Sequence, residues 1–75
     1  MIKVKSFENW ASGYDDIYYG VLCKATERIQ DDINDFIKGK NIKVLSLDIK
    51  HSIEPSGDNY ETCNISAVLS YMESE

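Results

Sequence analysis

Lysines and hydroxyl side chains are the residues in this sequence best suited to bind a charged ligand. Lys3 and Lys5 alternate near the start of the chain, and Lys38, Lys40 and Lys43 form a second group, which makes five of the eight basic residues. Lysines beside hydroxyl groups bind phosphate as point charges assisted by hydrogen bonds. The anion site that these residues predict consists of Lys3, Lys5, Lys43, Ser66 and Ser70.

The same lysines also have a simpler interpretation. Cations near a helix C-terminus compensate its dipole, and charges at strand ends keep a sheet soluble. Each such surface charge contributes little to the free energy of folding. Neither GxGxxG nor GxxxxGK[ST] occurs in the chain, so no glycine-rich phosphate loop supports the anion site. Both interpretations of the lysines therefore stay open at the level of sequence.

A thiol and an imidazole form the second candidate for chemistry. His51 is the only histidine, and it comes close to Cys63 if the strands that carry them form a hairpin. Such a pair is the minimum for thiol catalysis, but no third orienting group or oxyanion donor can be named, and two ligands are too few for zinc. Cys23 and Cys63 lack a CxxC partner, which predicts reduced thiols rather than a disulfide framework. We expect no enzyme activity, no metal and no cofactor.

Aromatic and acidic side chains are the remaining candidates. Five of the eight aromatic residues lie within thirteen positions, and they are either interface anchors or a loop packed on a small core. Three acids recur at intervals of four, which predicts a solvated helix face or, alternatively, a mimic of a phosphate track. The aromatic residues are Phe7, Trp10, Tyr14, Tyr18 and Tyr19, and the acids are Glu27, Asp31 and Asp35.

The composition limits what can position these residues. A chain of 75 residues with 43% hydrophobic and 28% charged content predicts one domain, residues 1–75, too small for a deep catalytic cleft within one protomer. Its net charge of -5 argues against duplex nucleic acid as a partner. No apolar run approaches 18 residues and no signal peptide is apparent, so we expect a cytoplasmic protein without a membrane contact.

Hydrophobic periodicity predicts a strand followed by one long helix. Ile2 and Val4 alternate with lysines, which predicts strand one over residues 2–7. Residues 8–13 interrupt this period, and Ser12 stands three positions before Asp15 as a loose capping box that predicts a helix start. Apolar residues then recur at intervals of three and four up to Ile37, although a glycine at position 20 delays the regular helix. The sequence Lys-Gly-Lys at 38–40 predicts its end.

The rest of the chain predicts a β-hairpin. Residues 41–53 are rich in β-branched and aliphatic side chains, and a change of phase between Val44 and Leu45 predicts a bulge. Turn residues gather at 54–59. Residues 60–72 alternate most regularly, with one apolar face made of Cys63, Ile65, Ala67, Leu69 and Tyr71.

These elements predict an α+β fold of β-α-β-β order, with a three-stranded antiparallel sheet of strand order 1-3-2 and the helix on one face. The other face is then bare, and we expect Lys3, Lys5 and Lys43 to point onto it near Ser66 and Ser70. Its short side chains allow close approach by another surface. The bare face carries Thr62, Asn64, Ser66, Val68 and Ser70, beside Ser46, Asp48, Lys50 and Ser52.

Four segments resemble a family of small acidic sporulation-associated proteins of bacilli and their phages, controlled by the mother-cell sigma factor. They are IKVKSFEN, DINDFIKG, IKVLSLDIKHSI and NYETCNISAVLSY, and together they cover much of the chain. Residues 10–30 look like an enlargement relative to shorter members. The resemblance implies a cytoplasmic, non-enzymatic protein and brings no catalytic residues with it.

Two functions are compatible with this layout. The first is a non-enzymatic binding protein that acts as a homo-oligomer and holds a protein partner through its open sheet face and aromatic segment. The alternative is an oligomeric protein that sequesters an anionic small molecule, such as a nucleotide signal in phage anti-defence. The predicted interface consists of Trp10, Tyr14, Tyr18, Tyr19, Ser46, Thr62, Asn64 and Val68.

Overall fold

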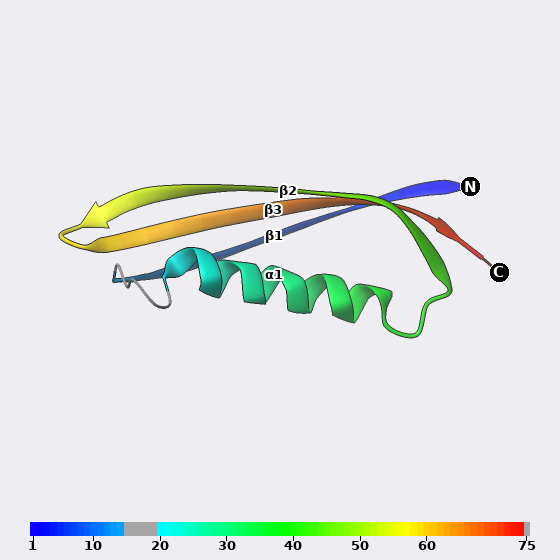
Figure 1. Cartoon of the computed structure of the whole chain (residues 1–75), viewed down its shortest axis with the longest axis horizontal. Helices are drawn as coiled ribbons and strands as arrows, with labels where there is room; N and C mark the ends of the chain where they lie inside the picture. Colours follow the sequence, from blue (N-terminus) through cyan, green and yellow to red (C-terminus); the bar gives the residue numbers. More distant parts are fainter. Residues whose placement is uncertain (15–19, 75) are drawn as a thin grey trace.

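The chain folds into a single sheet with one helix lying along it (Figure 1). The computed structural model describes residues 1–14 and 20–74. The elements are β1 (Ile2–Tyr14), α1 (Val21–Ile37), β2 (Ile42–Gly57) and β3 (Tyr60–Glu73). The α+β class and the β-α-β-β order predicted from the sequence are confirmed.

The sheet has the strand order β1-β3-β2, and β3 pairs antiparallel with both neighbours. α1 runs back along the sheet after β1, so β1 and β2 start at the same end and β3 returns between them (Figure 1). The predicted order is confirmed. It places the most regularly alternating strand in the centre, where β3 is paired along both of its edges.

β1 is longer than predicted, and this corrects the expected helix start at Ser12. Residues 8–13 continue the strand, in register with residues 61–66 of β3. The Ser12 hydroxyl lies 2.9 Å from the Thr62 hydroxyl across the strands instead of capping a helix. Ala11, opposite Cys63, is fully buried. Pairing and burial against β3 outweigh the weak β propensity of Asn, Ser and Gly in this segment.

α1 buries most of the side chains that its periodicity predicted, although Leu22 is exposed and Ile17 and Tyr18 lie outside the described residues. Val21, Ala25, Ile29 and Ile33 are its buried residues, four positions apart on one face. The helix begins directly after Gly20, as the glycine at that position suggested. At its C-terminus the Lys38 N–H donates to the Asn34 carbonyl at 3.0 Å, and Gly39 takes a φ of 74° that favours glycine.

The β2–β3 hairpin contains the predicted bulge and a tighter turn than expected. The register shifts between Val44 and Ser46, which confirms the bulge there. β2 extends into the predicted 54–59 loop up to Gly57, so that loop assignment is wrong for most of its length, whereas β3 begins at Tyr60 as predicted. Only two residues join the strands, and Asn59 has a φ of 58°, which asparagine tolerates. Pro55 is accommodated because β2 is an edge strand.

The core is a thin layer between α1 and two of the three strands. α1 packs against β1 and β3 and barely touches β2. The molecule is 51 Å long, whereas a helix of 17 residues extends about 26 Å at 1.5 Å per residue. Every residue of β2 except the half-buried Ile42 is exposed. The single helix therefore leaves one whole face of the sheet bare, and β2 bare on both faces.

Candidate binding surface on the open sheet face

The open face of the sheet is formed by alternate residues of all three strands. On β3 the residues at odd positions from Cys63 to Tyr71 are buried against α1, so the even positions face away from the helix. The register aligns these even positions with even positions of β1 and, after the bulge, of β2. The structure places on this face Ser46, Thr62, Asn64, Ser66, Val68 and Ser70, as expected.

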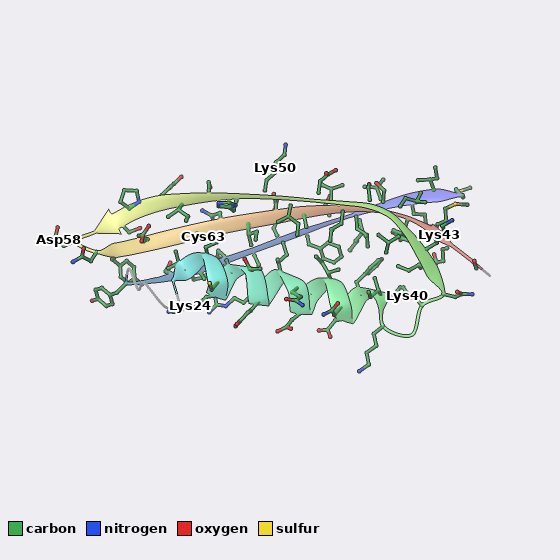
Figure 2. The ribbon with its side chains drawn as sticks, viewed as in Figure 1. Lys24, Lys40, Lys43, Lys50, Asp58 and Cys63 are labelled. Atoms are coloured by element: carbon green, nitrogen blue, oxygen red, sulfur yellow. The ribbon has the colours of Figure 1, made fainter. Side chains whose placement is uncertain are left out.

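A shallow hollow of about 600 Å³ lies at the middle of the open face. Asn64 and Ser66 of β3 form its floor, because they are paired on one side with β1 and on the other with β2. Figure 2 shows Lys50 of β2 pointing away from the helix, on this side of the sheet. The side chains of the open face that line the hollow are Glu8, Trp10, Lys50, Ser52, Asn64 and Ser66.

Trp10 is the aromatic residue of the hollow, and its backbone is held on both sides. Its side chain is 57% exposed. The Trp10 N–H donates to Asn9 Oδ1 at 2.9 Å, and the Arg28 guanidinium donates to the Trp10 carbonyl at 2.6 Å. Asn9 in turn donates to Asp32 on α1 at 2.7 Å. The Arg28 guanidinium also lies 5.9 Å from the centroid of the indole ring, within the range of a cation–π contact. Trp10 is thus exposed but anchored at the sheet edge.

Glu8 and Lys50 supply opposite charges on the two sides of the hollow. Both are the cross-strand partners of Ser66, Glu8 from β1 and Lys50 from β2. Within residues 1–14 and 20–74, neither side chain has an ion-pair partner. The side chains that line the hollow can together hold a ligand that has one apolar group, a positively charged group and a negatively charged group. They supply an exposed aromatic ring, a carboxylate, an ammonium group, an amide and two hydroxyls.

Lys3 and Lys5 do not lie where the anion site required them, and this corrects their expected place on the bare face. They are in phase with the buried Phe7 and therefore project on the helix side. Lys3 Nζ donates to Glu73 at 2.8 Å, and Lys5 Nζ lies 5.6 Å from the centroid of the Phe36 ring. The hydrogen bond and charge of Lys3 lower the pKa of Glu73, and those of Glu73 raise the pKa of Lys3.

Lys43 is the one member of the predicted lysine group on the open face. It stands opposite Met72, near the end of the sheet where Ser70 lies, and is remote from the hollow at roughly 20 Å along β2. Ser66 instead adjoins Lys50. The five residues of the predicted anion site are thus divided between two faces and do not converge.

The predicted aromatic segment is divided as well. Tyr14 packs edge to face with Tyr60 at 5.2 Å between ring centroids, at the hairpin end of the sheet. Phe7 is buried and packs against Phe36 at 5.6 Å. Tyr18 and Tyr19 lie outside the described residues. Trp10 is therefore the member of this segment that the structure connects with the hollow.

His51 and Cys63 share the helix side of the sheet but are not cross-strand partners. His51 of β2 stands opposite Ile65 and is exposed, whereas Cys63 stands opposite Ile53 and is buried. Burial raises the pKa of the Cys63 thiol, which disfavours the nucleophilic thiolate. In residues 1–14 and 20–74, no cluster of three or more His, Cys, Asp or Glu side chains could hold a metal ion.

The two cysteines should differ sharply in reactivity. Cys23 is exposed on α1 and Cys63 is buried in the core. We expect iodoacetamide at neutral pH to label Cys23 in the folded protein and to label Cys63 only after denaturation. Peptide mapping by mass spectrometry checks this outcome, with the urea-denatured protein as the control. Rapid labelling of Cys63 in the native state would contradict the placement of β3 under α1.

Sequence reasoning misses Glu8, because residues 8–13 predict a break between elements. The sequence predicts Lys50 and Ser52 on the bare face, which the register confirms, but it does not connect them with Trp10. The signal that could have found the hollow is the alternation of Glu8, Trp10 and Ser12, which continues the period of β1. The intervening Ala11 and Gly13 are small residues that lie on the buried side.

No protein-family model, curated protein or solved structure matches the chain. The resemblance to sporulation-associated proteins therefore stays a prediction. Within the described residues, no helix has the length and apolar character needed to cross a membrane.

Proposed function

We propose that this chain is a non-enzymatic binding protein that holds a protein partner on its open sheet face, with Trp10 as the anchor. The observation that carries the proposal is the hollow beside this exposed but anchored indole ring. Tryptophan side chains dominate binding energy where they meet a partner, because they offer a large rigid surface with a polar handle. A ring held in place before binding loses little conformational freedom.

The charges around the hollow suggest the chemistry of the partner. Glu8 and Lys50 on opposite sides favour a segment that presents both a basic and an acidic group, with an apolar side chain directed at Trp10. Asn64 and Ser66 between them offer hydrogen bonds to the segment's backbone. We also propose that the protein acts as a homo-oligomer, since a thin core on one side of a long sheet leaves much apolar surface uncovered.

The alternative of an anion-sequestering protein has weaker support. It now relies on Lys43 and Lys50, the lysines of the open face, because Lys3 contacts Glu73 and Lys5 lies on the helix side. These two lysines lie far apart along β2, so they do not surround one phosphate group. A nucleotide between protomers would have to bridge them.

Native mass spectrometry and matched variants test the binding function. The tagged protein is purified from its own host as wild type, Trp10→Ala, Tyr14→Ala and Lys43→Glu. We expect wild type, Tyr14→Ala and Lys43→Glu to retain the same protein partner. Trp10→Ala should weaken binding by at least about 30-fold, as for a hot-spot tryptophan worth about 2 kcal/mol.

Tyr14→Ala is the matched control, because it removes an exposed aromatic ring of the same strand outside the hollow. Equal retention of the partner by wild type and Trp10→Ala would overturn the proposal. A small anion that is retained by wild type and lost only in Lys43→Glu would favour the alternative.

A further inference from the structure

β2 is a long edge strand that the fold leaves uncovered. All of its residues from Lys43 to Gly57 are exposed. On the helix side it presents an apolar stripe of four side chains that are 41–50% exposed, because α1 lies over the other two strands. Long apolar edge strands pair readily with other chains, and natural monomers protect them. The stripe consists of Val44, Leu47, Ile49 and Ile53.

The opposite edge of the sheet is blocked at Trp10. On β1 the Trp10 N–H is occupied by the Asn9 side chain and the Trp10 carbonyl by Arg28 from α1. These bonds use backbone groups that another strand would need. Among the described residues, no side chain makes an equivalent bond to the outer backbone groups of β2. A further strand can therefore add to this sheet at β2 more readily than at β1.

We propose that two copies of this chain pair antiparallel along β2, forming a continuous six-stranded sheet with Ile49 on the two-fold axis. The proposal rests on the homo-oligomer named above and specifies the surface that forms it. It replaces contact through the open faces with contact along an edge. Antiparallel addition around a two-fold axis perpendicular to the sheet keeps both helices on the same side.

Charge selects this register. Cross-strand partners project on the same face. The apolar residues Leu47, Ile49 and Ile53 of the two copies therefore share one face only if odd positions oppose odd positions, and then even positions also oppose even positions. With Ile49 opposite itself, Asp48 of each copy stands opposite Lys50 of the other, which gives two attractive pairs. A shift by one step in either direction places Asp48 opposite Asp48 or Lys50 opposite Lys50, which is destabilising. Of these three registers, the one centred on Ile49 is thus the register in which the charges of β2 complement each other.

The same arrangement joins the two apolar stripes. Ile49 of both copies would lie side by side, and Leu47 of each copy would stand opposite His51 of the other. The diagonal neighbours Ile49 and Leu47 of the two copies would shield one another from water. The two open faces would form one surface with two hollows. Lys50 lines the hollow at the β2 edge of the sheet. Because Asp48 of the second copy would stand opposite Lys50, the second copy would add a carboxylate beside each hollow. Such a dimer could bind a partner at two positions at once.

Reversal of the charges tests the register. We expect sedimentation velocity of the full-length wild type, under reducing conditions and at micromolar concentration, to show a dimer. Asp48→Lys and Lys50→Asp each place like charges opposite one another twice per dimer, and each should weaken dimerisation by about tenfold or more. An equimolar mixture of the two variants, or the double variant Asp48→Lys/Lys50→Asp, should restore the dimer. All of these positions are exposed, and circular dichroism confirms that each variant is folded.

Cross-linking tests the axis. In a Cys23→Ser background, Ile49→Cys should form a disulfide-linked dimer on mild oxidation, because directly opposite residues on antiparallel strands have their Cα atoms about 4.5–5.5 Å apart, within the range that a disulfide spans. Val68→Cys, at a central exposed position of the open face, should stay monomeric on a non-reducing gel. A wild type that is monomeric at high micromolar concentration would overturn the proposal. Loss of dimer in the singles without recovery in the mixture, or cross-linking through Val68→Cys instead, would overturn it too.

The sedimentation and cross-linking results do not affect the test of partner binding with Trp10→Ala, because a monomer retains the hollow. Failure of the dimer is therefore distinguishable from failure of the binding function.

Discussion

Ile29→Ala should lower the free energy of unfolding by about 2–5 kcal/mol, the range for a buried isoleucine truncated to alanine. Ile29 is 1% exposed and lies at the centre of the buried row of α1. A domain of this size has only about 5 kcal/mol or a little more to lose, so much of the variant should be unfolded at 37 °C. Urea titration followed by circular dichroism at 222 nm measures the change.

The matched control for this variant is Ile49→Ala on β2. Ile49 is 49% exposed and lacks cover from α1. At a concentration at which sedimentation shows a monomer, its truncation should cost less than about 1 kcal/mol, since about half of its area is already in water. Equal costs at the two positions would mean that α1 also covers β2, contrary to the structure.

Ala25→Leu should destabilise the protein by about 1–3 kcal/mol through overpacking. Ala25, Ala11 and Cys63 are fully buried small residues near the N-terminal end of α1, and a larger side chain at Ala25 has no free volume to enter. At roughly 4–8 °C per kcal/mol for a domain of this size, the melting temperature should fall by several degrees or more. Thermal unfolding at fixed protein concentration measures the shift.

Gln30→Leu provides the control, because it adds the same leucine to an exposed position of the same helix. Leucine and glutamine have similar helix propensities, so the change should stay within about 0.5 kcal/mol of wild type. A melting temperature of Ala25→Leu equal to that of Gln30→Leu would show that α1 does not press on the sheet at this end.

The sequence predicted the features that depend on local periodicity. The apolar spacing of α1 identified Val21, Ala25, Ile29 and Ile33 as its buried face, because a helix brings positions four apart onto one side. The alternation in β3 identified its buried residues, and the change of phase after Val44 identified the bulge. Chain reversal by one helix and one hairpin left few arrangements, and the central position of β3 followed from them.

Where pairing between distant segments decides the structure, sequence reasoning was wrong. Asn9, Ser12 and Gly13 favour a break locally, yet pairing with β3 keeps them in a strand. Pro55 and Ser56 favour a loop locally, yet β2 continues through them to Gly57. Local propensities of about 1 kcal/mol are easily outweighed by burial and cross-strand hydrogen bonds.

The candidate site was predictable in part. The open face and the role of Trp10 as a binding residue could be proposed from composition and alternation. The hollow could not, because it requires Glu8 of β1 and Lys50 of β2 to be on opposite sides of Ser66, and register across three strands is a tertiary property. The lysine site was misplaced for the same reason, since the phase of β1 puts Lys3 and Lys5 on the helix side.

The sequence shows which residues are suited to bind a ligand, but it does not show which of them lie together in the fold. By itself the sequence determined the number, order and buried faces of the elements, because periodicity is a property of neighbouring residues. Only the tertiary structure decided which edge of the sheet stays open. One helix of 17 residues is too short and too narrow to cover three strands of 13 to 16 residues, and in settling over β1 and β3 it leaves β2 exposed.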